Sequence, residues 1–357
     1  MPPFCPNPNC QYHQGFHDSW PVKRHGFYCR QAHPQRIQRY QCLACRRTFS
    51  SQTFDCTYWL KRPEILPRLF MKSIGAMANR QIARDLAVSP ATVDRQLSRL
   101  GRHCLLLHQS VSPQHRAQGP LVIDGFETFE FSQYHPCHFN LGVEANTGFF
   151  HYFTDSELRR KGRMRPDQKR RRQELERRLG RPDPRAVEQG ILELLRVCCP
   201  EGPGATLRRD DHPAYARAIQ QLPQDLQQEI TPSIQRRGAD NPLFEVNLLD
   251  LLIRHSCANH RRETIAWAKR RQRAAERMAI FLVWRNYVKQ RWEKGPAQTP
   301  AMLKGLACQP LSVPEILATR LFPSRVELPS RWQDYYWSRI PTRAIPHNRQ
   351  HELKYAV

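Results

Sequence analysis

Four cysteines in two pairs constrain what the first part of this chain can fold into. Cys5 and Cys10 form one pair, and Cys42 and Cys45 form the other. The segment that carries them, residues 1–56, is polar and has little helical periodicity, so it needs a cross-link or a metal to fold on its own. Four thiolates suit tetrahedral Zn²⁺ at about 2.3 Å from each sulfur. We therefore expect a small zinc ribbon.

This zinc site is expected to be structural, because full thiolate coordination leaves no position open for water. Three residues between the pairs, His25, Cys29 and His33, are alternative ligands. The plainer alternative is that the cysteines are free thiols, although a polar segment of this length then has nothing to hold it.

The charge of the chain points to a polyanionic partner. Its 357 residues include 56 Lys and Arg against 32 Asp and Glu, a formal net charge of +24. A surface this basic attracts nucleic acid, and ribosomal or membrane-surface binding would explain the charge alone equally well. The sequence has no run of eighteen apolar residues and no signal-peptide segment at its start, so we expect no membrane association. The expected location is the cytoplasm of a bacterium, at the nucleoid, where disulfides are disfavoured.

Residues 62–108 have the helical pattern of a helix-turn-helix module. Pro63 is placed to start a first helix, and Ser89 with Pro90 is placed to cap and start a third one, which we expect to end at Gly101. The third helix would act as a recognition helix in a major groove. Its expected DNA-contacting residues are Thr92, Arg95, Gln96 and Arg99. The alternative is that these residues form an ordinary three-helix unit, since any such unit has a similar sequence pattern.

Acidic residues follow buried-strand patterns in the next region, residues 119–292. Asp124 lies in an apolar strand of a predicted meander, 119–131, 138–145 and 149–153, whose last two strands are joined by a turn. Asp210 ends a later apolar run and precedes a helix, and its neighbour Asp211 is the alternative.

A third acid, Glu245, falls in the first turns of a helix opened by Asn241 and Pro242. Asp124, Asp210 and Glu245 would then meet at one point, where carboxylates can hold two Mg²⁺ ions about 3.5–4 Å apart for phosphoryl transfer, with Mn²⁺ as a substitute. A structural salt bridge is the competing role for Glu245. Glu263 is the alternative third acid, although an unbroken helix would place it about 27 Å beyond Glu245.

Three further segments are assigned by composition. Residues 109–118 are polar and contain Pro113, so they are predicted to be a linker. Residues 156–204 interrupt the strand pattern with many arginines, and we interpret them as a basic insertion that either is a surface feature or grips phosphates. Residues 293–357 are rich in proline and aromatics and are expected to drape over the main domain as a C-terminal extension without chemistry of their own.

The motifs together resemble the InsA/InsB-type DDE transposases of bacterial insertion sequences. The resemblance covers residues 5 to about 290. The segments that carry it are residues 38–48, with the second cysteine pair; 122–124, with Asp124; 209–215, with Asp210; 245–249, with Glu245; and 262–269, with Glu263. Asp211 stands where the family motif has glycine.

The resemblance implies a ribonuclease-H-like catalytic domain of mixed α+β or α/β class, preceded by the zinc ribbon and the helix-turn-helix. It also implies Mg²⁺ dependence, binding of double-stranded DNA at terminal inverted repeats, cleavage, and transfer of a 3′-OH to target DNA by a homodimer or higher oligomer. The alternatives are a non-catalytic DNA-binding regulator and a nuclease of the same fold that performs no strand transfer.

Overall fold

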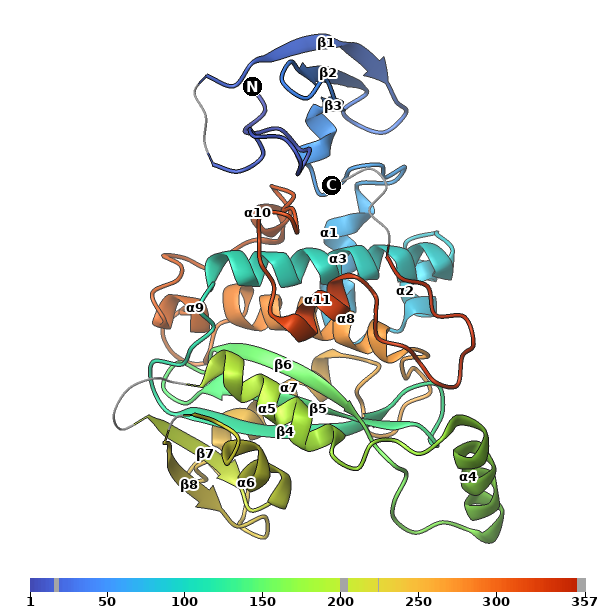
Figure 1. Cartoon of the computed structure of the whole chain (residues 1–357), viewed down its shortest axis with the longest axis vertical. Helices are drawn as coiled ribbons and strands as arrows, with labels where there is room; N and C mark the ends of the chain where they lie inside the picture. The colour runs from blue at the N-terminus through green and yellow to red at the C-terminus, as the bar shows by residue number, and fades with distance from the viewer. Residues whose placement is uncertain (16–18, 200–204, 224, 352–357) are drawn as a thin grey trace.

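The N-terminal ribbon is a three-stranded antiparallel sheet. In this computed structural model, which describes residues 1–15, 19–199, 205–223 and 225–351, its strands are β1 (Val22–Cys29), β2 (Arg36–Cys42) and β3 (Thr48–Ser50). They pair in the order β1-β2-β3, and the short helix η1 (Ser51–Phe54) follows. The expected strand, turn and strand around the second cysteine pair are present as β2 and β3 (Figure 1).

A helical module follows, with α1 (Ile65–Ile74), α2 (Asn79–Asp85) and α3 (Pro90–Val111). The Ser89 hydroxyl accepts a hydrogen bond from the Thr92 amide, so the predicted cap is present. The predicted end of this helix at Gly101 is wrong. A Cβ at Gly101 would lie 2.5 Å from the carbonyl oxygen of Glu276 on α8, so the glycine allows close packing of two helices while α3 continues. The extension also takes up the start of the expected linker as far as Val111, and His115, further along the linker, is buried.

The main body is built on a five-stranded mixed sheet. Its strands are β4 (Leu121–Phe129), β5 (Pro136–Glu144), β6 (Phe150–Glu157), β7 (Thr206–Asp210) and β8 (Gln227–Thr231), in the order β6-β5-β4-β7-β8. The first three form the predicted antiparallel meander, and β7 and β8 run parallel to β4 and to each other. The turn between β5 and β6 contains Gly148 at a φ of 64°, a conformation that favours glycine.

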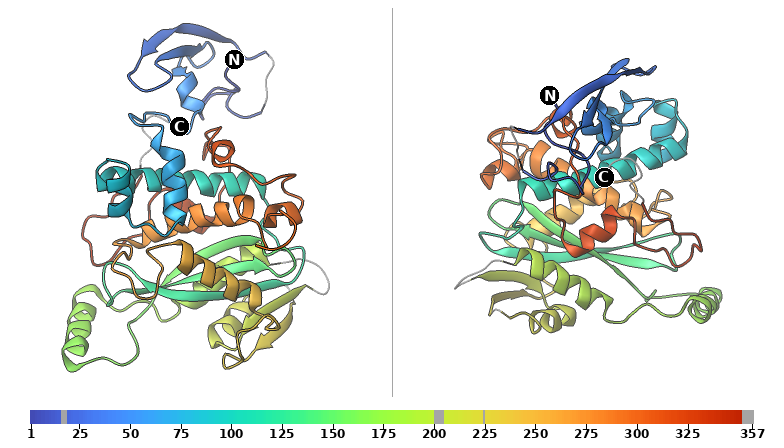
Figure 2. Two further views of the ribbon diagram at one scale, coloured as in Figure 1. Left: turned by 180° about the vertical axis from the view of Figure 1, so that it is seen from behind. Right: turned by 45° about the horizontal axis from the view of Figure 1, so that its top comes forward.

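Helices cover both faces of this sheet, as Figures 1 and 2 show. Helix α5 (Ala186–Cys198) packs on one face, where Leu194 and Cys198 lie against Gly142 of β5. Helix α7 (Phe244–Ser256) packs on the other, and α6 (Pro213–Ile219) follows β7. The chain is therefore of mixed α+β class.

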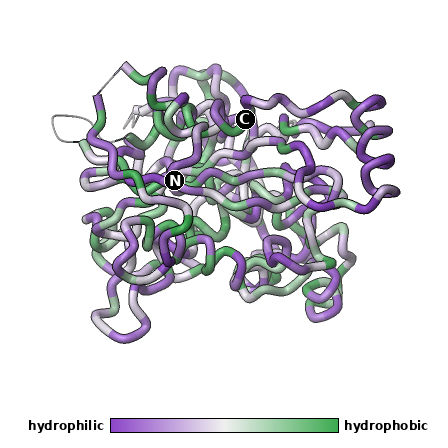
Figure 3. Tube along the Cα trace, turned by 90° about the horizontal axis from the view of Figure 1, so that it is seen from below, coloured by the Kyte–Doolittle hydropathy of each residue, from purple (hydrophilic) through white to green (hydrophobic). Residues whose placement is uncertain are grey.

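The expected basic insertion 156–204 divides into two different parts. Helix α4 (Pro166–Leu179) buries none of its residues, carries six basic and three acidic side chains, and projects from the body as a purple helix in Figure 3. Helix α5, in contrast, belongs to the core, because its apolar stripe, including Ile191 and Leu195, is buried against the sheet. Residues 200–204 lie outside the described part of the chain.

The chain does not form one unbroken helix from Glu245 to Glu263. Helix α7 ends at Ser256, and α8 (Arg271–Val283) begins after an irregular connection and runs into η2 (Trp284–Val288). The connection turns back to the sheet because the buried His260 ring packs edge-on against Phe126, at 5.2 Å between ring centroids. Helices α3 and α8 lie side by side over the sheet (Figure 2).

The C-terminal segment is part of the core. It contains α9 (Pro300–Leu303), α10 (Val313–Ile316) and α11 (Ser330–Tyr336), and the side chains of Trp332 and Tyr335 are fully buried. The same segment holds the zinc-ribbon module, since Phe322 packs edge-on against Phe4 and Ser324 hydrogen-bonds His13 at 2.8 Å. Within the described residues, every helix is too short or too polar to cross a bilayer.

A buried carboxylate, Asp155 of β6, joins the sheet to two other parts of the fold. Its oxygens lie 2.6 Å from Nε of Arg271 at the start of α8 and 2.7 Å from Nη2 of Arg331 on α11. The Tyr335 hydroxyl donates a third contact at 2.6 Å. Burial alone would raise the pKa of Asp155, but the two guanidinium groups and the hydroxyl lower it below its ordinary value.

We expect the substitution Asp155→Ala to reduce the free energy of unfolding by about 3–5 kcal/mol, because it removes the shortest ion pair of the buried Arg271 and of the half-buried Arg331. Urea unfolding followed by tryptophan fluorescence measures this loss. Glu174→Ala on α4, which breaks an exposed ion pair with Arg171, is the control and should change stability little. Equal effects of the two substitutions would contradict the structural role of Asp155.

Candidate functional site

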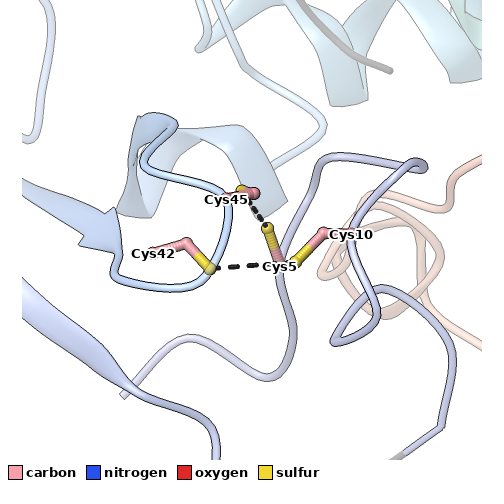
Figure 4. A group of neighbouring side chains, drawn as sticks. All are labelled: Cys5, Cys10, Cys42 and Cys45. Carbon is pink, nitrogen blue, oxygen red and sulfur yellow. Dashed lines mark hydrogen bonds between the residues drawn. The ribbon is translucent and has the colours of Figure 1, made fainter.

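The four predicted zinc ligands converge at the base of the ribbon (Figure 4). Cys5, Cys10, Cys42 and Cys45 place their sulfurs within 4.8 Å of one another, and three of the four side chains are buried. The Cys5 and Cys45 sulfurs are 3.6 Å apart, and those of Cys10 and Cys42 are 3.8 Å apart. A tetrahedron with metal–sulfur bonds of about 2.3 Å has edges of roughly 3.8 Å, so these spacings fit zinc.

The surroundings act differently on the members of this cluster, because burial raises the pKa of Cys5 and of Cys10 whereas the pKa of Cys42 is lowered. Burial would raise the pKa of Cys42, but hydrogen bonds from the backbone of Cys45 and Ala44 and from the Trp20 indole N–H bring it down to about 7. The sequence alternatives His25, Cys29 and His33 are not members of the group, and Cys29 is exposed on β1. The four close cysteines could thus hold a structural metal such as zinc, as the pair spacing predicts.

The predicted recognition-helix residues differ in their accessibility. Arg95 is exposed, and the Thr92 hydroxyl lies 3.0 Å from that of Ser89. Gln96 is half-buried. Arg99 instead donates hydrogen bonds to the carbonyl oxygens of Cys56 and Tyr58, at 3.1 and 2.7 Å, and so ties α3 to the segment between the ribbon and α1.

Asp124 and Asp210 are brought side by side by the sheet. Strands β4 and β7 are parallel, with Leu121 opposite Leu207 and Val122 opposite Arg208, and continuing this register places Asp210 level with Asp124. The Tyr215 hydroxyl donates a long hydrogen bond, 3.4 Å, to Asp124. Asp211, the sequence alternative, is exposed and accepts a hydrogen bond from the Ser233 amide, away from Asp124.

Asp124 points to the face of the sheet that α7 covers. Phe126, two residues further along β4 and hence on the same face, packs under the guanidinium of Arg254 and against His260. Asp250 lies one turn before Arg254 on α7 and is ion-paired with it at 2.8 Å. Asp250 is therefore level with Asp124 across the gap between helix and strand.

These carboxylates act on one another electrostatically. The pKa of Asp124 is raised to about 6, first by burial and then by the negative charges of Asp210 and Asp250, while Arg237 and a backbone hydrogen bond oppose the shift. Burial also raises the pKa of Asp250. Among the described residues, only the cysteine group has three or more ligand atoms within 4.8 Å, so the carboxylates are spaced more widely.

Glu245 and Glu263 are not close to this pair of aspartates. Glu245, in the first turn of α7, is ion-paired with Arg291 at 2.7 Å and faces the Gly148 turn. That turn adjoins the start of β4, whereas Asp124 is three residues, roughly 10 Å, further along the strand. Glu263 is exposed on the connection between α7 and α8. The structure thus gives Glu245 the salt bridge that was its competing role.

The residue that sequence reasoning missed is Asp250. A signal for it exists, because Asp250 lies four residues after Val246 and three before Ile253, both buried on the sheet-facing stripe of α7. An acid inside such a stripe is costly unless it has a partner or a role.

A basic cavity of about 300 Å³ lies further along β4 than Asp124. It is lined by Glu127, Thr128, Phe129, Arg254, Arg261 and Arg262. Its three arginines give this cavity a positive charge.

Comparisons with known proteins do not identify a family for this chain. No protein family model matches the chain, and no curated protein matches it. One similar solved chain comes from the "CryoEM structure of simian T-cell lymphotropic virus intasome in complex with PP2A regulatory subunit B56 gamma", at 11% identity and a TM-score of 0.27. The match covers 55% of this chain and 58% of that one, less than two thirds of its length. A similarity this low carries no functional argument.

We expect the purified chain to hold one zinc per molecule and the Cys42→Ser variant to lose it, because one of four thiolates is removed. Metal analysis by mass spectrometry measures the zinc, and limited proteolysis should cut the metal-free protein within residues 1–56 while the body resists. Cys29→Ser is the matched control and should keep its metal. Equal zinc in both variants would overturn the assignment.

The substitution Asp124→Asn should stabilise the protein in the absence of added divalent cations. Above pH 6 the folded state holds a carboxylate whose pKa is raised, so its charge costs about 1–3 kcal/mol that the amide does not. As pH falls through 6 towards 4, the folded carboxyl takes up a proton that the unfolded chain does not. The difference in unfolding free energy between variant and wild type should therefore shrink over that range.

Urea unfolding at several pH values measures this difference. Asp167→Asn, at an exposed position on α4, serves as the matched control and should show no such trend. A variant that is less stable than wild type at pH 7.5, or a difference that does not change with pH, would rule out the electrostatic strain at Asp124.

Proposed function

We propose that this chain is a metal-dependent phosphoryl-transfer enzyme that acts on DNA, in the manner of the transposases that its sequence motifs resemble. The observation that carries the proposal is the register that sets Asp124 beside Asp210, with Asp250 opposite them on α7. Burial and the charges of Asp210 and Asp250 raise the pKa of Asp124, and groups perturbed in this way are typical of functional sites.

The donor set fits hard divalent cations. Asp124, Asp210 and Asp250 offer carboxylate oxygens, the ligands that Mg²⁺ and Mn²⁺ prefer, and their mutual repulsion would be relieved by positive charge between them. When bound, two such ions would activate a nucleophile and neutralise charge on the reacting phosphate. Asp250 takes the place that the family resemblance gives to Glu245.

The side chains around the carboxylates would position the DNA. Tyr215 holds Asp124 through its hydroxyl, and burial keeps the Tyr215 pKa high, so the hydroxyl stays protonated and able to donate. Arg254 and Arg262 adjoin the carboxylates in the basic cavity and would pair with phosphates flanking the reacting one. Helix α4, with its exposed arginines, would add phosphate contacts at a distance from the carboxylates.

The fold is consistent with the proposal. An antiparallel meander with an acid on its first strand, a second acid at the end of a later strand, and a third on a helix that packs against the sheet is the arrangement expected of a ribonuclease-H-like domain. The ribbon and the helix-turn-helix would recognise terminal repeats, and the joining of two DNA ends would require at least a dimer on DNA.

With Mg²⁺ and DNA that flanks its own gene, the protein should produce nicked and joined products. Asp124→Asn, Asp210→Asn and Asp250→Asn should each reduce product formation by at least about a hundredfold, because each removes a carboxylate that would hold the metals. Gel electrophoresis of labelled DNA measures both products, and fluorescence anisotropy should show that binding is kept.

Glu245→Gln and Glu263→Gln are the matched controls, and both should stay within about tenfold of wild type. An inactive Glu245→Gln beside an active Asp250→Asn would return the third acid to Glu245. Nicks without joined products would indicate a nuclease of this fold. Binding without nicks in the wild-type protein would identify a non-catalytic regulator and remove the catalytic proposal.

A further inference from the structure

A second large cavity lies away from the carboxylates, over the first half of α3. It has a volume of about 730 Å³, within the range of pockets that take small molecules. Its walls come from the segment before α1, the start of α3, the start of α8 and the chain after α11. Four parts of the sequence far from one another thus enclose one space.

The walls of this cavity are strongly basic. Its lining includes Lys61, Arg62, Arg95, Arg99, Arg102, Arg273 and Arg349, and no acidic residue stands among the described residues that line it. Arg273 is ion-paired with Asp94 and Glu276 beside the cavity, and Arg62 is paired with Glu64. The remaining basic side chains give the space a positive potential suited to a phosphate group.

An aromatic side chain stands at the cavity wall. Trp59 is 69% exposed, although its indole is large and apolar, and its backbone has a φ of 62°, which is unusual for a residue other than glycine. Trp59 meets Tyr58 edge-on, with ring centroids 5.9 Å apart. An exposed indole held beside arginines is the combination on which nucleic-acid bases stack.

The same geometry restricts how α3 can meet DNA. Arg99 holds the carbonyl oxygens of Cys56 and Tyr58, so the segment that carries Trp59 is fixed over the helix. Gln96 and Arg102 also face the cavity. All four expected recognition residues, Thr92, Arg95, Gln96 and Arg99, thus line this cavity, which has room for a nucleotide and is too small for a duplex.

We propose that this cavity binds unpaired DNA, with a base stacked on Trp59 and its phosphate among the arginines of α3 and the 61–62 segment. The inference rests on the proposed function only in taking DNA as the polyanion. It adds that the bound form includes at least one nucleotide out of its duplex, at a DNA end or a distorted junction. A base on an aromatic platform is held by stacking, so no particular sequence is required.

Binding of two fluorescent DNAs tests this inference without any added Mg²⁺. One is a blunt duplex, and the other is the same duplex with a short single-stranded 3′ extension that carries 2-aminopurine. The wild-type protein should bind the extended DNA about tenfold more tightly and quench 2-aminopurine. Trp59→Ala should remove both effects, Trp59→Phe should keep most of them, and Arg95→Ala should weaken binding of the extended DNA more than that of the blunt DNA.

Trp292→Ala is the matched control, because Trp292 is 43% exposed and does not line the cavity. Equal affinity of the wild-type protein for both DNAs would overturn the inference, as would a preference that Trp59→Ala retains. Thermal unfolding of Trp59→Ala and Trp59→Phe shows whether both remain folded. Since no cleavage is measured, failure of the catalytic proposal would leave these results unchanged, and failure here would leave the carboxylate site unaffected.

Discussion

The fold depends on a charge buried where three parts of the chain meet. Asp155 lies on the sheet, Arg271 begins α8, and Arg331 belongs to the C-terminal segment. A carboxylate in this position is costly without its partners, so the sheet is stable only when the C-terminal segment that carries Arg331 packs over it. These ion pairs fix the position of α8 on the sheet. Helix α3 then packs against α8 at Gly101.

At the candidate site, in contrast to the ion pairs of Asp155, carboxylates of like charge lie near one another. Asp124 and Asp210 are neighbours because two parallel strands share a register, and Asp250 is opposite because α7 is anchored at both ends. The anchors are the Glu245 pair with Arg291 at its start and the return of His260 to the sheet after its end. A fold that tolerates such repulsion sacrifices stability at one place, which is a common property of catalytic sites.

Local patterns allowed much of the fold to be predicted. The cysteine spacing, the Ser89 cap and the turn at Gly148 each depend on a few adjacent residues, and the structure contains all three. Gly101 was misinterpreted because a glycine in a helix can mark an end or a close contact, and only the neighbouring α8 decides between them.

The choice between Glu245 and Asp250 as the proposed third acid could not be made in the same way. Glu245 and Asp250 both lie beside the buried stripe of α7, and they differ only in their position along the helix relative to β4. That offset is a tertiary quantity, set by Arg291 and by the turn after Ser256, and no local pattern encodes it.

If the chain acts on DNA as proposed, the docking of the ribbon fixes a distance on the bound duplex. Phe322 and Ser324 contact Phe4 and His13, so the N-terminal ribbon is attached to the same C-terminal segment that covers the sheet. Two DNA-binding sites that are joined rigidly contact the duplex at a separation that the protein sets, because neither site can move relative to the other. The number of base pairs between a recognised sequence and a reacting phosphate would then be a constant of the fold.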